Sequence, residues 1–472
     1  MGPAETQINP QQPRDIADAE KGIKNAELRG ADGTASSGST ATTGDIEAEG
    51  ANTGDIECWN YPRSNIVKTL STFWAFFVMG ANDSAYGPLL PYLETHYALS
   101  YTTVSLVFLS PIAGYTLAAI TNNKLHLHLG RRGIAYLSPG CHLLAYIVNC
   151  VHPPYPVLVV SFIFAGLGNG LADSAWNAWV GNMKDSNQML GLLHGVYGAG
   201  AVMAPLVATS LITEAGVGWW YFYYIMVACA LAELVFCLYA FWDSTAASFR
   251  ASQAQHTPSS SSNPDGSEAT VIDEKGGVRR ALFVPRYARV TWLLSIFLLG
   301  YVGMEVAIGG WVVTFLMRVR NGAEFASGMG STGYWLGITV GRVVLGFVTP
   351  RVGEKSAIAI YLVLAIAFNL IFWLVPNFYA SVVAVSFQGF FLGPMFPGAV
   401  VVATRLLPRA LHVSAIGFAA AFGASGAAVL PFAVGAVAQA KGVEVLQPFA
   451  IGLSGGILLL WLALPRMPRV NV

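Results

Sequence analysis

The amino-acid sequence predicts an all-α integral membrane protein with twelve transmembrane helices in two pseudo-symmetric six-helix halves. Of its 472 residues, 54% are hydrophobic and only 11% are charged, whereas a soluble protein has about 25% charged residues. Twelve strongly apolar stretches lie between residues 66 and 465, and the last six repeat features of the first six. The stretches must be helices, because lipid offers the backbone no hydrogen-bond partners.

The apolar stretches form two groups of six around a polar break. Each is close to the roughly 20 residues that a helix needs to cross about 30 Å of hydrocarbon. The first six are expected at 66–93, 101–121, 134–151, 155–182, 188–212 and 219–242. The last six are expected at 289–315, 326–348, 356–375, 379–404, 410–438 and 446–465. The two halves therefore cover residues 64–242 and 289–466.

Polar segments surround the two halves. Residues 1–63 are rich in Gly, Ala, Ser, Thr, Asp and Glu, and residues 243–288 are rich in Ser. Neither segment can bury enough apolar surface to order itself. We therefore expect a disordered N-terminal tail, a disordered central loop and a short tail at 467–472. The N-terminal tail lacks a basic start followed by an apolar core, which argues against a signal peptide.

Basic residues predict the orientation in the membrane. Most Lys and Arg residues, among them Arg131 and Arg132, lie in the tails and the even-numbered loops. The odd-numbered loops hold chiefly Arg318, Arg320 and Lys441. The positive-inside rule therefore places both termini in the cytosol. We expect the plasma membrane, with the vacuole and the Golgi as alternatives.

Composition and motifs argue against several classes of function. Lys plus Arg equals Asp plus Glu at 26 each, so the net charge points to no nucleic-acid partner. The five cysteines show no CxxC spacing and no neighbouring His cluster, so we expect neither a disulfide framework nor a metal site. The sequence has no P-loop, GxSxG or HExxH motif. We therefore expect no enzyme, no bound cofactor and no transport driven by ATP.

Intervals between glycines and other marker residues reveal the internal repeat. The recurring intervals are four residues in Asp83–Gly87 and Glu305–Gly309, five in Gly200–Pro205 and Gly426–Pro431, and 16 in Gly114–Gly130 and Gly337–Gly353. Small residues at such positions let helices approach closely. Matching membrane halves are typical of secondary transporters, which expose a central site to each side of the bilayer in turn.

The loop between the second and third stretches, at 123–132, reads NKLHLHLGRR. It resembles the marker loop of the major facilitator superfamily, Gly-x-Leu-x-Asp-Arg-x-Gly-Arg-Arg, with Leu127 and His128 in place of the Asp and Arg. In the second copy of the loop, Pro350 stands where the Asp belongs. The resemblance implies that a gating loop is formed by Gly130, Arg131, Arg132 and Arg351.

Three spans carry a closer resemblance, to the fucose-permease-like group and its fungal relatives. They read ANDSAYGPLLPYLE at 81–94, GLGNGLADSAWNAW at 166–179 and YVGMEVAIGGWVVTFL at 301–316. Fucose permease is a proton–sugar symporter with an Asp in the first span and a Glu in the fourth. The resemblance places Asp83 at the first of these positions and Asp173, in place of the Glu, at the second.

Few ionisable residues lie deep within the spans. A charge at the centre of a bilayer costs about 2.5–3.5 kcal/mol on insertion scales, so such residues usually face a cavity or one another. We expect Asp83, Asp173 and Glu305 to couple transport to protons. The alternative is that each hydrogen-bonds a kinked backbone and holds helices together. We find no evident partner for Glu233, and we expect Arg342 to extend toward the cytosolic end in a structural role.

Polar and aromatic side chains accompany these acids. Asn169 and Asp173 share a helical face with the Trp176–Asn177 pair, and an amide, a carboxylate and an indole together are typical of sugar-binding surfaces. The expected substrate-binding residues are Asn82, Asn169, Trp176, Asn177, His194, Tyr197, Trp311 and Gln388. His194 has the alternative role of bonding a neighbouring helix. If Gly166 corresponds to Gly389, then Asp173 corresponds to Phe396, and the second half offers an aromatic wall.

Three functions fit these features. The first is proton symport of a small polar solute such as a monosaccharide. The second is export of drug-like or secondary-metabolite molecules by proton antiport, which aromatic residues in the cavity would suit. The third is a non-transporting nutrient sensor, which long cytosolic tails would favour; the moderate N-terminal tail and the C-terminal tail of a few residues argue against it. The expected partners are the small-molecule substrate, protons and the lipid bilayer, with no nucleic acid, and we expect a monomer.

Overall fold

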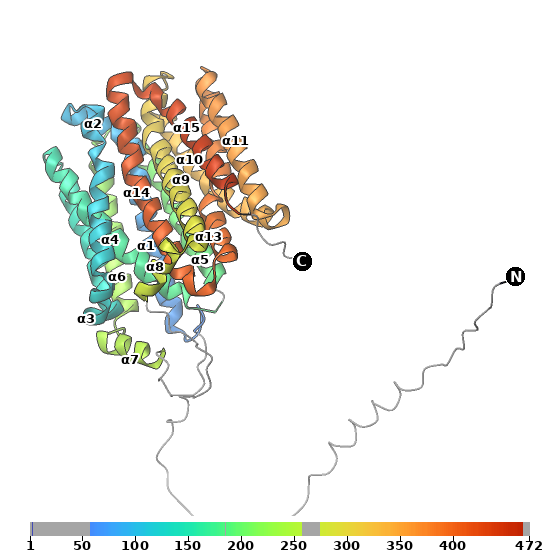
Figure 1. Ribbon diagram of the computed structural model, residues 1–472. Coiled ribbons are helices and arrows are strands. Elements are labelled where there is room, and N and C mark those ends of the chain that lie inside the picture. Colours follow the sequence, from blue (N-terminus) through green and yellow to red (C-terminus); the bar gives the residue numbers. More distant parts are fainter. Residues whose placement is uncertain (1, 3–56, 185, 257–273, 466–472) are drawn as a thin grey trace, which may run out of the picture. The chain divides into compact units, whose positions relative to one another are not determined.

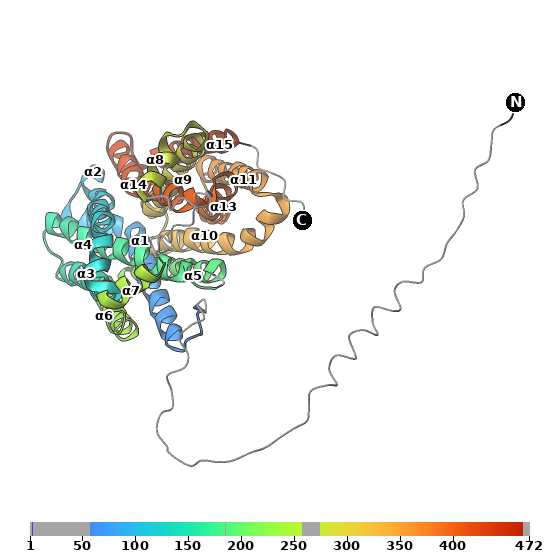
Figure 2. The same cartoon turned by 60° about the horizontal axis from the view of Figure 1, so that its bottom comes forward.

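The computed structural model describes residue 2 and residues 57–184, 186–256 and 274–465, which form helices without any strand in those ranges (Figure 1). Most of the expected N-terminal tail, residues 257–273 of the expected central loop and the tail at 467–472 lie outside the described residues. The described helices confirm the all-α prediction. Figure 2 shows the blue to green helices of the first half beside the yellow to red helices of the second.

The helices of the first half follow the predicted spans with one difference. They are α1 (Ser64–Tyr97), α2 (Tyr101–Val104), α3 (Leu106–Cys150), α4 (Tyr155–Gly181), α5 (Ser186–Thr213) and α6 (Tyr221–Ala240). The second and third expected spans are joined in α3, whose backbone is helical except at Gly130. There φ is +70° and ψ is −172°, a conformation that glycine adopts readily.

Gly130 divides α3 into two arms. The first arm, before Gly130, continues from α2, and both run along α4 and parallel to it. The Tyr155 hydroxyl, at the start of α4, donates to the carbonyl of Thr103 over 2.8 Å. Near the other end of α4, a Cβ added to Gly170 would lie 2.7 Å from the Cβ of Ala118. Residue numbers therefore rise together on the two helices, as in a parallel pair.

The second arm of α3 runs the opposite way along α4. The Ser161 hydroxyl donates to the side-chain oxygen of Asn149 over 2.7 Å, and the Ser138 hydroxyl donates to the carbonyl of Gly168 over 2.9 Å. Residue numbers here fall on α3 as they rise on α4. The chain therefore reverses direction at Gly130, and α3 supplies two of the expected spans.

The second half repeats this arrangement. Its elements are α9 (Pro285–Arg318), α10 (Glu324–Val352), α11 (Glu354–Leu374), α12 (Phe378–Leu392), α13 (Met395–Leu406), α14 (Arg409–Lys441), the 3₁₀ turn Val443–Val445 and α15 (Leu446–Leu462). The span expected at 379–404 is divided between α12 and α13. Pro394 stands at this break, where a residue without a backbone N–H interrupts the helical ladder.

Two short helices occupy described parts of the expected central loop, α7 (Ala246–His256) and α8 (Glu274–Phe283). Helix α7 packs against α3, and α8 packs against α9 and α14. Ala281 of α8 is 1% exposed within the core of the molecule. The parts of 243–288 that adjoin each half are therefore helical, because they cover neighbouring helices in a way that composition does not reveal.

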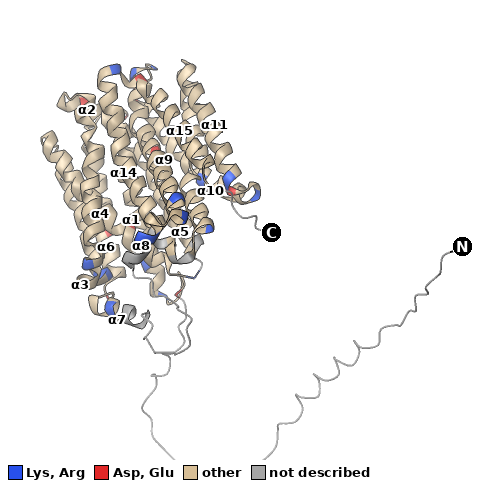
Figure 3. Cartoon of the chain, in the orientation of Figure 1, with Lys and Arg blue, Asp and Glu red and all other residues tan. Residues whose placement is uncertain are grey.

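Within the described residues, ten helices are long and apolar enough to cross a membrane. One of them, Tyr101–Cys150, contains two expected spans on either side of Gly130. Helix α1 is not among the ten, since Asn82 and Asp83 lie near its middle. Together these helices account for the twelve expected spans. Figure 3 shows that the middle of the bundle carries few charged residues and that many of the charges lie toward its ends.

The repeat seen in the sequence recurs in the helix packing. A Cβ added to Gly200 of α5 would lie 2.1 Å from the carbonyl oxygen of Phe77 on α1. In the second half, a Cβ added to Gly426 of α14 would lie 2.0 Å from the carbonyl oxygen of Leu299 on α9. The two halves therefore use matching glycines for the same close approach of helices.

One pair of repeat-related glycines meets directly. A Cβ added to Gly87 of α1 would lie 2.2 Å from the carbonyl oxygen of Gly309 on α9. The two helices thus cross backbone against backbone, at one of the places where the halves touch. Asp83 and Glu305 each precede this crossing by one helical turn, on the side of Gly130.

Polar contacts join the halves at the opposite end from Gly130. The Tyr92 hydroxyl donates to Oε2 of Glu324 over 3.0 Å, and Nη2 of Arg318 lies 3.7 Å from Oε1 of Glu94. The backbone N–H of Tyr101 donates to the side-chain oxygen of Gln439 over 2.8 Å. The two halves are therefore closed against each other at this end.

Candidate functional site

Asp83 of α1 is the centre of a polar cluster within the first half. Its Oδ1 accepts hydrogen bonds from Nδ2 of Asn82 and Nδ2 of Asn169, each over 3.0 Å, and its Oδ2 accepts one from the Tyr197 hydroxyl over 2.9 Å. Asn169 lies on α4 and Tyr197 on α5. Three helices therefore deliver hydrogen-bond donors to one carboxyl group, and all three donors are electrically neutral.

A second layer lies behind Asn169. Its side-chain oxygen is 2.9 Å from Nε2 of His142, and Nδ1 of His142 is 2.9 Å from Oε2 of Glu233. Both ionisable side chains are fully buried. The sequence shows no evident partner for Glu233, but the structure gives it one, and His142 is not among the expected site residues. Helices α3 and α6 are far apart in the sequence, and only their packing brings the pair together.

A neighbouring cluster surrounds Asp173 on α4. The Asn177 amide donates to Oδ1 of Asp173 over 2.8 Å, and the Asn177 oxygen lies 3.2 Å from Nε2 of His194. Asp173 is close enough to Asp83 for the two carboxyl groups to interact electrostatically. The structure thus brings together Asp83, Asn169, Asp173, Asn177 and Tyr197.

Trp176 does not take part in this polar face. Its ring stacks on Phe241 with 4.5 Å between the ring centroids, and the side chain is fully buried in a core cluster of the first half. A difference of one residue from Asn177 turns a side chain by about 100° around a helix. Of the two adjacent residues, Asn177 therefore faces the polar cluster, while Trp176 faces the helix packing.

Glu305 of α9 lies in a different electrostatic setting. Its Oε1 is 3.6 Å from Nη2 of Arg342, and Nε of Arg342 donates to the carbonyl of Gly393 over 3.2 Å. The Arg342 side chain is 22% exposed and the Glu305 side chain 11% exposed. We expected Arg342 to extend toward the end of the helix, but it is held instead beside a buried carboxylate, whose charge it balances.

Two other expected site residues lie apart from these contacts. The indole N–H of Trp311 donates to the carbonyl of Pro431 over 2.9 Å, and its ring meets Tyr101 edge-on near the closed end. Gln388 of α12 is fully buried, and neither of its amide atoms has a hydrogen-bond partner among the described residues. Such a group costs free energy unless a ligand or water bonds to it.

The loop around Gly130 packs against the chain that follows α6. A Cβ added to Gly130 would lie 2.4 Å from the carbonyl carbon of Thr245, so only glycine fits. The backbone N–H of Arg132 donates to the carbonyl of Ser244 over 3.0 Å. Its guanidinium lies 3.6 Å from the ring centroid of Trp242. Here a cation–π contact is made in the loop that lacks the superfamily's usual Asp.

The remaining residues of the expected gating loop differ between the halves. The guanidinium of Arg131 lies 5.9 Å from the ring centroid of Phe249. Arg351 is exposed in the last turn of α10. The ion pair at this end of the second half joins Arg405 and Glu354, with N–O distances of 2.5 Å and 2.7 Å. Neither Arg405 nor Glu354 is among the expected site residues.

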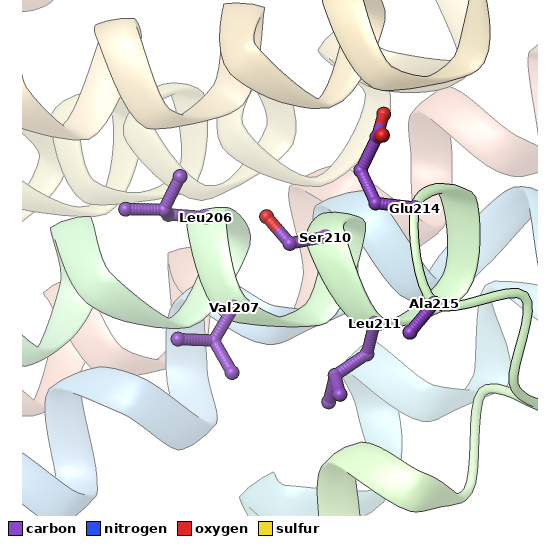
Figure 4. A pocket seen from close by; sticks show the side chains of 6 residues that line it. All are labelled: Leu206, Val207, Ser210, Leu211, Glu214 and Ala215. Carbon is purple, nitrogen blue, oxygen red and sulfur yellow. The ribbon is translucent and has the colours of Figure 1, made fainter.

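The described residues contain no group of three or more His, Cys, Asp or Glu side chains that could hold a metal ion. A hollow of about 470 Å³ lies along α5, lined by Leu206, Val207, Ser210, Leu211, Glu214 and Ala215 (Figure 4). It begins about 13 Å further along the helix than Tyr197, at 1.5 Å per residue. Its lining comes from the last turns of α5 and the two residues that follow the helix, so we do not assign it to the polar cluster.

The model of the family described as Major Facilitator Superfamily matches residues 72–329 and 307–472. The chain is a member of this superfamily. It is 30% identical over 401 residues to Bypass of stop codon protein 6 of Saccharomyces cerevisiae, covering 82% of this chain and 80% of the yeast protein. It is 21% identical over 368 residues to the glucose/mannose transporter GlcP of Bacillus subtilis, covering 76% and 85% of the two chains.

Solved structures share the superfamily fold. The crystal structure of a D-xylose–proton symporter matches with a TM-score of 0.65 and 13% identity, covering 85% of this chain and 98% of that one. The nucleoside transporter NupG, as a D323A mutant, matches with a TM-score of 0.64 and 14% identity, covering 84% and 99%. FucP in its outward conformation matches with a TM-score of 0.54 and 15% identity, covering 84% and 99%.

Proposed function

We propose that this member of a transporter superfamily moves a small polar solute, such as a monosaccharide, together with a proton, and that Asp83 carries the proton. The observation that supports this most is the setting of Asp83. Its carboxyl group accepts three hydrogen bonds from neutral donors. A proton can therefore neutralise Asp83 without leaving a nearby cation unpaired, which would be costly inside the membrane.

The different setting of Glu305 supports Asp83 as the proton carrier. It occupies the position in the second half that repeats Asp83, but it is paired with Arg342. Protonation of Glu305 would leave the charge of Arg342 unbalanced. We therefore assign Glu305 to holding α9 and α10 together and assign proton transfer to Asp83, with Asp173 as its neighbour on the route.

The solute class rests on the groups beside Asp83 and on the relatives. Asp173, Asn177 and His194 offer donors and acceptors that suit hydroxyl groups. A relative is named as a glucose/mannose transporter, and a protein of the same fold is named as a D-xylose–proton symporter. We propose hexoses and pentoses as the first solutes to test.

We also propose that both termini face the cytosol, as the basic residues suggest. The end closed by Tyr92, Glu94, Arg318 and Glu324 is then the outer one. Solute and proton would enter after these contacts open, bind near Asp83, and leave after the outer end has closed again.

The test is uptake of labelled monosaccharides by the purified protein in liposomes, with and without an inward proton gradient. The proposal expects accumulation of at least one sugar that needs the gradient and disappears in Asp83→Asn, while a Gly140→Ala control transports normally. Accumulation that follows an outward gradient would favour the antiport exporter. A folded protein that moves no sugar in either direction would refute the sugar assignment.

A further inference from the structure

A continuous line of hydrogen-bonded side chains crosses the first half from α6 to α1. It runs from Glu233 to His142, Asn169 and Asp83, with distances of 2.9 Å, 2.9 Å and 3.0 Å between the bonded atoms. The side chains of Glu233 and His142 are both fully buried. Burying such a pair is costly unless each group is well bonded, so packing alone does not explain its presence.

The helix packing makes room for this line. A Cβ added to Gly168 of α4 would lie 2.5 Å from Cδ2 of His142. Only glycine at this position lets the imidazole approach α4 closely enough to reach Asn169. The α3–α4 contact therefore depends on both residues, because Gly168 leaves the space that His142 occupies.

The second half has nothing comparable at the matching positions. The register that pairs Gly166 with Gly389 also pairs Asn169 with Leu392, which is fully buried. The register that pairs Gly130 with Gly353 pairs His142 with Ala365, also fully buried. Apolar residues thus suffice for this packing, and the polar line in the first half needs another explanation.

The hydrogen-bond donors and acceptors fix the direction of the line. Nδ2 of Asn169 donates to the carboxylate of Asp83, so its Oδ1 faces Nε2 of His142 and must accept a hydrogen bond from the Nε2–H group. Nδ1 of His142 then either donates to ionised Glu233 or accepts from protonated Glu233. In both cases one proton lies between the two residues, and the pair has no net charge.

We propose that Glu233 and His142 are positioning residues that hold the Asn169 amide with its N–H toward Asp83 and thereby favour the ionised form of that carboxyl group. This inference rests on the proposed role of Asp83 as the proton carrier. When Asp83 takes up a proton, its new O–H needs an acceptor. The Asn169 oxygen can turn to accept it only by giving up the bond from His142, so the pair promotes release of the proton.

Other titratable groups surround Asp83 and His142. Asp173 of α4 and Tyr115 of α3 interact electrostatically with Asp83, as do Tyr86 of α1 and Tyr197 of α5. The ring of Tyr146 stacks on His142 with 5.9 Å between centroids. All of them are retained in the variants below. His142 itself also interacts electrostatically with Asp83, so the combination with Asn169→Leu is needed to separate this direct effect from positioning.

The test is an infrared titration of protonated carboxyl groups in the purified full-length protein in lipid, without substrate. The band of Asp83 is identified by its loss in Asp83→Asn. The main variant replaces both positioning residues, His142→Leu with Glu233→Leu, so that no buried charge is left unpaired. We expect the midpoint of the Asp83 titration to move to higher pH, with a rise in proton affinity of about three- to tenfold, because the hydrogen bond from Asn169 to the carboxylate is weakened rather than lost.

Asn169→Leu provides a second variant, which places in α4 the residue found at the matching position of α12. It should move the midpoint in the same direction, and adding the double substitution should cause little further change, because the pair acts through Asn169. Asn369→Leu is the matched control. Asn369 is buried between α11 and α15, where its amide faces the carbonyl of Gln447, and its loss should leave the midpoint unchanged.

An unchanged midpoint in the double variant, or in Asn169→Leu if the double variant does not fold, would overturn the proposal. So would a full additional shift when the double substitution is combined with Asn169→Leu, because the pair would then act without Asn169. The titration needs no substrate, so these outcomes count against positioning alone. Failure of proton-driven uptake counts against the proposed function.

Discussion

The two halves of the molecule share their helix packing but differ in where they place charge. In the first half, Asp83 is bonded by neutral groups and is backed by the buried His142–Glu233 pair. In the second half, Glu305 faces Arg342 directly. The same scaffold therefore holds one acid among neutral donors, to which we assign proton transfer, and one acid whose charge is balanced by Arg342. A duplicated fold can divide its tasks without changing its helix contacts.

Asp83→Asn should have the largest effect on the difference between the two halves. This substitution keeps the size of the side chain and removes the carboxyl group to which we assign proton uptake. We expect proton-driven accumulation of sugar to be abolished, while exchange of labelled for unlabelled sugar across the membrane continues. Both are measured in the same liposomes. Loss of exchange as well, in a protein that folds normally, would show that Asp83 is needed for more than proton coupling.

Replacing Arg342 tests whether its charge balances that of Glu305 in the second half. Arg342→Met leaves Glu305 buried without its counter-charge, and we expect a loss of about 3 kcal/mol in stability, as for other broken buried pairs. Combining it with Glu305→Gln should restore most of this loss. Thermal unfolding of the purified protein measures both effects. Equal stability of the single and double variants would contradict the view that the two charges balance each other.

The contact between the halves can be probed at Gly87. Gly87→Ala would place a methyl group 2.2 Å from the carbonyl oxygen of Gly309, so α1 and α9 must move apart. Overpacking of this kind costs about 1–3 kcal/mol, and thermal unfolding should detect it. Gly140→Ala is the matched control, because nothing lies within 4 Å of the added methyl group. The changes in the free energy of unfolding caused by the two substitutions should therefore have opposite signs or clearly different sizes.

The smallest expected effect is at the closed end. Glu94→Gln weakens the partly exposed ion pair with Arg318, and such pairs contribute about 0–1 kcal/mol. We expect a modest shift toward the state that is open at this end. In a Ser100→Cys background, thiol labelling at this position near the closed end should become up to about fivefold faster. Slower labelling would mean that the ion pair opposes closure.

The spans and their duplication could be predicted because they depend on local properties. Apolar length marks a membrane helix, and the glycine intervals mark helix contacts that both halves use, such as Gly200 on Phe77 and Gly426 on Leu299. Asp83 and Glu305 stood out because charges are rare inside spans. These features can be recognised in the sequence without knowing which helices pack together.

The buried pair could not be predicted in this way. His142 and Glu233 lie 91 residues apart, and neither position suggests the other until α3, α4 and α6 are packed. Trp176 and Asn177 were treated as one unit although they point to different neighbours. The signal that would have found the pair is Gly168, whose missing side chain is needed only if something large approaches α4 there.

The crossing of Gly87 and Gly309 divides α1 into two lever arms of unequal length. At 1.5 Å per residue, the arm from Gly87 to Tyr97 is about 15 Å long and the arm back to Ser64 is about 34 Å long. A rotation of one half by about 10° around the crossing would displace these ends by about 3 Å and 6 Å, given the helical rise. A small opening at the closed end would therefore accompany a movement about twice as large at the other end.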